Sequence, residues 1–153
     1  MQLVQGFSHI ATVTDDMDRL IAFYQRVFDA HVLYDLEEEG MRHAVIDVGG
    51  GALHAFQVPW VQGDDRREIF ERGRTDHYGI TVPTVEALLE VRRRLEAEGD
   101  GVTDSQIRDF GPVYSLHFAD PDGVNLEVNL FKPTWGTEPM LHRADWTVVD
   151  FAA

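Results

Sequence analysis

The amino-acid sequence predicts an α+β protein built from two paired βαβββ modules, with a cup-shaped sheet and the helices outside. The first observation behind this prediction is a repeat, because one order of strand and helix patterns occurs twice along the 153 residues. The second is that His9 and His77 stand at the start of the first strand of each half. The third is physical: four strands and one helix cannot bury both faces of a sheet, so two such modules are expected to pair.

The first half of the chain carries one helix pattern among four strand patterns. Residues 15–29 place apolar side chains at helical spacing, and Asp15 or Thr14 can cap this helix. The members of that apolar face are Met17, Leu20, Ile21, Tyr24, Val27 and Phe28. Runs rich in β-branched and aromatic residues predict strands at 6–13, 31–36, 41–48 and 52–58.

The pattern begins again after a polar stretch at 59–75, which is predicted to be a linker. A helix is expected at 83–100, with Thr84 as its cap and Gly99 at its end. The segment ADPDG at 119–123 predicts a turn, since proline presets φ and Asp-Gly tolerates a positive φ. Strands are predicted at 76–82, 101–110, 112–119 and 124–131.

The chain is therefore predicted to be a single domain, 1–153, with modules at 5–58 and 76–131 and a tail at 132–153. The tail is irregular and carries Trp135 and Trp146. We expect it to pack on the outside of the sheets or on a partner chain; the alternative is that it lines the mouth of the cup.

Composition and charge exclude several classes of partner. Asp and Glu number 27 against 13 Lys and Arg, a formal net charge of −14. Nucleic acids and anionic membrane surfaces both require a basic footprint, so we expect neither as a partner. The absence of cysteine removes disulfides, thiolate ligands and cysteine nucleophiles. The first residues, MQLVQGFSHIATVTDD, resemble no signal peptide, and we expect a cytoplasmic protein.

Four residues with metal-ligand chemistry occupy corresponding places in the two halves. His9 and His77 begin the first strands, and His54 and Glu127 lie in the middle of the last strands. If first and last strands are neighbours in each sheet, these side chains converge at the centre of the cup. Three imidazoles and one carboxylate suit Fe(II), Mn(II), Ni(II), Co(II) or Zn(II). The alternative is that each histidine is a hydrogen-bonded core residue.

Other polar residues are given structural interpretations. His43 and His117 lie in strands but away from the corresponding positions, and His31 and His142 are expected at the surface. Two further pairs stand near Glu127: Asp120 and Asp122 are expected to form the turn, whereas Asn125 and Asn129 share the face of Glu127 and can contact a substrate or orient ligands.

The segments AFYQRVF, DHYGITVP and DPDGVNLEV, together with His9, resemble the vicinal oxygen chelate superfamily over about residues 5–132. That superfamily includes glyoxalase I, extradiol dioxygenases, methylmalonyl-CoA epimerase, fosfomycin-resistance enzymes and bleomycin-binding proteins. The resemblance implies paired βαβββ modules, often as a homodimer, around a divalent metal held by His9, His54, His77 and Glu127. It also implies a small substrate that chelates the metal through neighbouring oxygens.

The resemblance leaves the reaction open. A glyoxalase-like lyase or isomerase uses a metal-bound glutamate as base, a role that Glu127 can fill, but His54 stands where glutamate or glutamine is usual. An extradiol dioxygenase uses two histidines and one glutamate, here His9, His77 and Glu127, but Phe118 takes the place of its tyrosine. We favour His54 as a direct ligand over a role facing the substrate, and we name Glu127 and His54 as the catalytic candidates. The other possibility is a non-catalytic protein that binds drugs of the bleomycin type.

Overall fold

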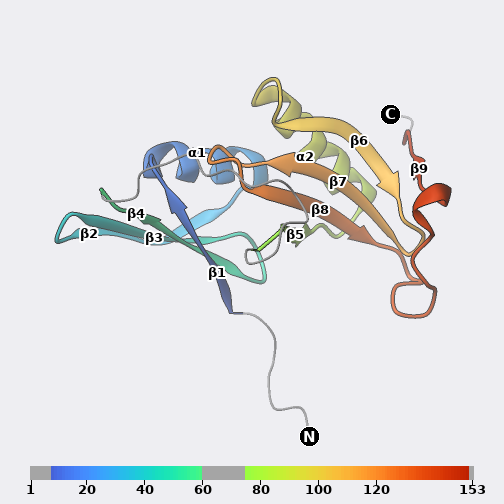
Figure 1. The fold of residues 1–153 in the computed structure, drawn as a ribbon, viewed down its shortest axis with the longest axis horizontal. Helices are drawn as coiled ribbons and strands as arrows, with labels where there is room; N and C mark the ends of the chain where they lie inside the picture. Colours follow the sequence, from blue (N-terminus) through green and yellow to red (C-terminus); the bar gives the residue numbers. More distant parts are fainter. Residues whose placement is uncertain (1–7, 60–74, 152–153) are drawn as a thin grey trace, which may run out of the picture. The chain divides into compact units, whose positions relative to one another are not determined.

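The computed structural model describes residues 8–59 and 75–151 and divides the chain into two compact units, Met1–Asp65 and Arg66–Ala153. The predicted linker at 59–75 lies outside the described residues, apart from its two ends. Each unit contains one βαβββ sequence of elements, drawn in Figure 1.

Unit 1 is a four-stranded sheet with one helix. Its elements are β1 (His9–Thr14), α1 (Met17–Phe28), β2 (His31–Glu38), β3 (Met41–Asp47) and β4 (Ala52–Gln57). The strand order is β1-β4-β3-β2, with β1 parallel to β4 and the other pairs antiparallel. The first and last strands are therefore neighbours, which is the condition for bringing His9 near His54.

The helix α1 covers one face of this sheet. Its buried side chains are Met17, Leu20, Phe23, Tyr24 and Val27, all at most 1% exposed. They pack toward Ala44 and Ile46 of β3 and Leu53 and Ala55 of β4, which are also buried. Because side chains alternate along a strand, the opposite face of the sheet carries the residues in between, including the histidines of β1, β3 and β4.

Unit 2 repeats this arrangement and adds one strand. Its elements are β5 (Tyr78–Thr81), α2 (Val85–Ala97), β6 (Thr103–Asp109), β7 (Val113–Ala119), β8 (Asn125–Phe131), a 3-10 helix η1 (Arg143–Asp145) and β9 (Thr147–Val148). The strand order is β5-β8-β7-β6-β9, with β5 parallel to β8. Leu88 and Leu95 of α2 are fully buried, as are Ile107, Leu116 and Val128 of the sheet.

Residues 132–151 of the tail pack onto the rest of unit 2. After β8 it returns to the edge of the sheet, where β9 pairs antiparallel with β6, as Figure 1 shows in red beside yellow. The Nζ of Lys132 lies 2.7 and 2.8 Å from the two carboxylate oxygens of Asp109 at the end of β6. The indole N–H of Trp146 donates to the carbonyl of Leu141 at 3.1 Å. A ninth strand was not predicted from the sequence.

The predicted helix caps are partly confirmed. Thr84 caps α2, its hydroxyl accepting from the backbone N–H of Ala87 at 3.2 Å. For α1, however, the prediction of Asp15 or Thr14 is wrong, because Asp16 is the cap and accepts from the N–H of Arg19 at 3.0 Å. The cap must be the last residue before the helical turn, and α1 begins at Met17, two residues later than predicted.

No helix in the described part of the chain is both long enough and apolar enough to cross a membrane.

Candidate functional site

In unit 1, the predicted residues His9 and His54 lie against one another. Their rings stack with centroids 4.0 Å apart and planes inclined by 24°. The parallel pairing of β1 with β4 produces this contact, since Ala11 is the residue opposite His54 and His9 lies two positions before it on the same face. His43 of β3 adds a third ring, with its centroid 5.2 Å from that of His54.

The environment of His54 favours its neutral form. Burial lowers the pKa of His54 below its ordinary value, and the nearby imidazoles of His9 and His43 lower it further, because a second positive charge beside them is unfavourable. Metal binding requires a neutral imidazole with an available lone pair. Near neutral pH, His54 is therefore in the neutral form that a metal ligand requires.

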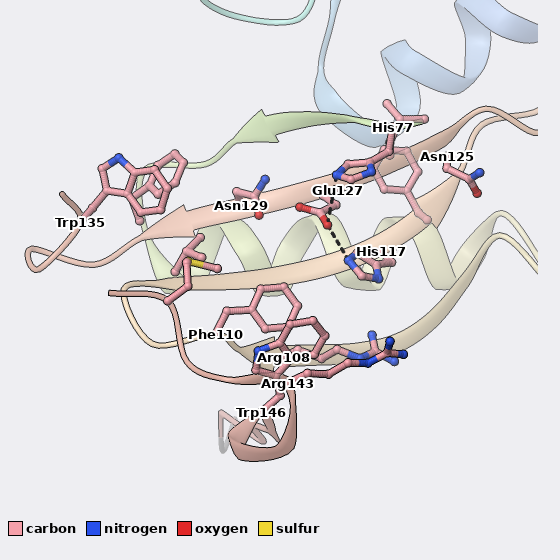
Figure 2. A pocket seen from close by; sticks show the side chains of 15 residues that line it. His77, Arg108, Phe110, His117, Asn125, Glu127, Asn129, Trp135, Arg143 and Trp146 are labelled. Carbon is pink, nitrogen blue, oxygen red and sulfur yellow. Dashed lines mark hydrogen bonds and ion pairs between the residues drawn. The ribbon is translucent and has the colours of Figure 1, made fainter. Parts of the chain in front are cut away.

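In unit 2, two histidines meet the carboxylate of Glu127 (Figure 2). The Nε2 of His117 lies 2.7 Å from Oε1 of Glu127, and the Nε2 of His77 lies 3.6 Å from the same oxygen. On the other side of its ring, the Nδ1 of His77 lies 2.7 Å from a carboxylate oxygen of Asp76. A carboxylate only accepts, so this bond places a proton on Nδ1 and directs the Nε2 of His77 toward Glu127.

Glu127 is ionised at neutral pH. Burial opposes its charged form, but the hydrogen bond from His117, the charges of His117 and His77 and a hydrogen bond from Asn129 favour it, and together they hold the pKa of Glu127 below its ordinary value. A carboxylate with a low pKa is a good ligand and a weak base. The geometry therefore suits Glu127 to hold a cation better than to remove a proton by itself.

A pocket of about 700 Å³ opens over these residues in unit 2. The polar residues His77, His117, Asn125, Glu127 and Asn129 share it with two arginines and with aromatic and apolar residues. The remaining lining residues are Arg108, Phe110, Val113, Phe118, Leu126, Phe131, Trp135, Met140, Arg143 and Trp146. Its size and its apolar walls with a few convergent polar groups are typical of small-molecule sites.

The pocket also shows where part of the tail lies in unit 2. Trp135, Met140, Arg143 and Trp146 line it, so in unit 2 the tail contributes to a cavity wall rather than only covering the outside of a sheet. Sequence periodicity could not show this, because the tail has no repeating pattern.

The role of His117 was missed in the sequence. His117 and Glu127 are paired residues of the β7–β8 hairpin, at equal distances from the turn around Asp122. The predicted turn was the signal that could have found this contact. Asp120 does form that turn, accepting from the backbone N–H groups of Asp122 and Val124 at 3.0 and 2.9 Å. His43, expected to be structural, stacks on Phe56 with centroids 4.3 Å apart.

The structure thus assembles the four predicted ligands as two pairs, His9 with His54 and His77 with Glu127, one pair in each unit. Within the described ranges, no group of three or more His, Asp or Glu side chains is arranged to hold a metal ion. The chemistry of the pairs nevertheless fits a divalent ion of the first transition row, since imidazole nitrogen and carboxylate oxygen are its usual ligands. The Asp76–His77 bond is of the kind that orients a ligating histidine.

Comparison with solved structures shows the same fold in other proteins. A glyoxylase/bleomycin resistance protein/dioxygenase domain from Frankia sp. EAN1pec matches with a TM-score of 0.71 and 22% identity, over 85% of this chain and 94% of that one. The fosfomycin resistance protein FosX from Listeria monocytogenes, in a structure complexed with Mn(II) and sulfate, matches with a TM-score of 0.60 and 20% identity, over 86% and 96%. A glyoxalase/bleomycin resistance protein/dioxygenase from Alicyclobacillus acidocaldarius matches with a TM-score of 0.62 and 16% identity, over 85% and 94%.

The family model of these proteins matches residues 6–128, which cover the first βαβββ sequence, the second as far as the middle of β8, and all four predicted ligands. With this match and the shared fold, the chain belongs to the Glyoxalase/Bleomycin resistance protein/Dioxygenase superfamily, the vicinal oxygen chelate superfamily.

Proposed function

We propose that this protein is a divalent-metal-dependent enzyme acting on a small substrate that chelates the metal through neighbouring oxygen atoms. One observation carries the proposal: ionised Glu127 lies beside an oriented His77 in an aromatic pocket of about 700 Å³. A carboxylate and an imidazole in a cavity with largely apolar walls are the kind of ligands from which a protein builds a metal centre.

The proposed ligands are His9, His54, His77 and Glu127. The equivalence of the pairs supports them, because each joins a residue at the start of a first strand, His9 in β1 or His77 directly before β5, to a residue of the neighbouring parallel last strand. The metal, when bound, supplies Lewis acidity toward the oxygens of the substrate. Two residues beside the ligands orient them. Asp76 keeps the proton of His77 on Nδ1, and the Nε2 of His117 forms a hydrogen bond with Glu127.

The reaction is a lyase or isomerase step of the glyoxalase kind or ring cleavage of the extradiol kind. A proton abstraction needs a base with a pKa near the working pH. The lowered pKa of Glu127 makes this carboxylate a weak base. His54 is the better candidate for the base if His54 does not itself bind the metal. His54→Ala separates the two roles: loss of metal makes it a ligand, and full metal content with lost turnover makes it a catalytic group.

Elemental analysis of protein purified without chelator tests the proposal. We expect about one divalent ion per chain in the unmodified protein and sharply lower content in His9→Ala, His77→Ala and Glu127→Gln. His31→Ala is the matched control, because His31 is an exposed histidine at the start of β2. If the three ligand variants retain full metal content, the proposed site is wrong.

A non-catalytic binding protein is the second candidate, and the aromatic lining of the pocket favours it. For that function, small aromatic molecules are expected to bind equally well before and after chelator treatment, and no metal is expected in the purified protein. Homodimer formation and a cytoplasmic location stay predictions.

A further inference from the structure

The tail gives the pocket of unit 2 a wall that a βαβββ sequence does not contain. Main-chain hydrogen bonds hold this wall against the sheet: the N–H of Leu141 donates to the carbonyl of Phe110 at 2.9 Å, and the N–H of Val149 donates to that of Ile107 at 2.8 Å. Gly111, with φ of +97°, allows a close approach, since a Cβ there would lie 3.1 Å from Cγ of Leu141. The tail is therefore fixed to the sheet by specific contacts where it lines the pocket.

Two aromatic pairs join the sheet to the tail across the pocket lining. Phe110 and Trp146 have ring centroids 4.3 Å apart, and Phe131 and Trp135 have the same separation. Each pair combines one ring from the β-sheet region with one from the tail. Aromatic surfaces of this kind favour a flat ring that can contact them face to face or edge to face.

Arg143 brings a positive charge to the same lining. Its guanidinium lies 5.9 Å from the ring centroid of Trp146, and within the described residues no carboxylate pairs with it. Arg108, in contrast, forms an ion pair with Asp104. Figure 2 shows both arginine side chains extending in the same direction along one side of the pocket.

This unmatched charge is informative because the chain is strongly acidic. With a net charge of −14, carboxylates greatly outnumber cations, and Arg19, Arg42 and Arg93 all pair with Asp or Glu. A guanidinium held over an indole ring is preorganised, and its planar donors match an oxyanion such as a carboxylate.

We propose that the pocket recognises a flat aromatic molecule bearing an anionic group, with its ring on the two aromatic pairs and its anion on Arg143. This inference rests on the proposed function, whose substrate class it narrows: an aromatic acid that also presents neighbouring oxygens on the side of Glu127. Arg108 contributes less, because Asp104 already neutralises it.

An aromatic cation is the competing ligand, since Glu127 lines the same pocket. The contacts argue against it. The carboxylate of Glu127 already has the Nε2 of His117 at 2.7 Å and the Nε2 of His77 at 3.6 Å, whereas no carboxylate of the described residues pairs with Arg143.

Calorimetric titration of the full chain after chelator treatment tests the inference without the metal. The probes are 2-naphthoate, its neutral isostere 2-naphthamide and the cation 2-naphthylmethylammonium. We expect 2-naphthoate to bind at least about tenfold more tightly than 2-naphthamide, and more weakly as salt increases. Arg143→Gln is expected to remove this preference and leave 2-naphthamide binding unchanged. Arg93→Gln, on the exposed side of α2, is the control of equal charge change and is expected to keep the preference.

The inference is overturned if the amide or the ammonium probe binds as tightly as 2-naphthoate, if no probe binds, or if Arg143→Gln leaves the preference intact. The metal content of the same preparations, measured before chelation, separates this failure from that of the proposed function. Naphthoate binding through Arg143 in a protein that purifies without metal contradicts the enzyme and supports the anion site. Stoichiometric metal in a protein that shows no preference for 2-naphthoate supports the enzyme and contradicts the anion site.

Discussion

Gly79 gives Asn129 its place beside Glu127. Gly79 pairs with Glu127 across β5 and β8, and a Cβ at Gly79 would lie 2.5 Å from Nδ2 of Asn129. That distance is too short for contact, but the obstructing atom is the end of a side chain. A larger residue at this position therefore displaces the amide of Asn129 and leaves the backbone in place, which makes Gly79 a residue of the site rather than of a turn.

Gly79→Ala is accordingly expected to weaken Mn(II) binding by roughly tenfold, since hydrogen bonds to a ligating group influence metal affinity on that scale. Isothermal titration with Mn(II) measures it, with the melting temperature as the check that the fold is kept. Gly51→Ala is the control, because no atom lies within 4 Å of a Cβ there. Combined with Asn129→Ala, Gly79→Ala is expected to add no further loss; full additivity of the two changes contradicts the explanation.

At the scale of the element, α1 shows how one side chain sets the start of a helix. Asp16 has extended backbone angles, φ −144° and ψ 96°, and its carboxylate accepts from the N–H of Arg19. The hydroxyl of Thr14 in turn accepts from the N–H of Asp16 at 3.1 Å and holds the backbone segment that leads into the helix. The helix that begins here buries its apolar face on the sheet that carries His54, so the cap supports one half of the candidate site.

Asp16→Ala is expected to lower the free energy of unfolding by about 1 kcal/mol, because it leaves a backbone donor of the first turn without its acceptor. Asp15→Ala removes only an exposed ion pair with Arg19 and is expected to cost less than about 0.5 kcal/mol. Urea denaturation of both variants beside the unmodified protein measures the difference. Equal losses in the two variants would mean that charge near the helix start, and not the cap bond, stabilises α1.

At the scale of the whole molecule, acid is expected to weaken the fold through groups whose pKa values are lowered in the folded chain. His54 has a pKa below its ordinary 6.5 in the folded chain, so the unfolded chain binds more protons below that pH. Its contribution to stability is complete above about pH 6.5 and is lost as the pH falls toward the folded-state pKa. The carboxylates Glu127, Asp35 and Asp104 act in the same direction at lower pH.

The free energy of unfolding of the metal-free protein is therefore expected to decrease between pH 7 and pH 5.5, and His54→Phe is expected to flatten this slope while keeping a ring against His9. Urea titrations at several pH values give the slopes, and His31→Asn serves as the control for removing an exposed histidine. A slope that is the same in His54→Phe and the unmodified protein would assign the pH dependence to other groups.

The sequence by itself determined the order of the two helices and of strands β1 to β8, the corresponding positions of His9 and His77 in the two halves, the cap at Thr84 and the turn at Asp120. These features follow from periodicity and from the backbone preferences of single residues, which act over a few positions. The repeat also located both candidate pairs, because neighbouring first and last strands bring equivalent positions together on one face of a sheet.

Only the tertiary structure decided that His117 forms a hydrogen bond with Glu127, that Asp16 caps α1 and that the tail lines the pocket. The contact of His117 depends on the register of a hairpin, and a shift of one residue turns every side chain to the other face. The cap is the last residue with extended backbone angles before the helix. Asp15 and Asp16 are identical neighbours, so the sequence does not show which of them takes that place. The tail has no periodicity, so its place is set by long-range bonds to Phe110 and Ile107 and by the pairing of β9 with β6.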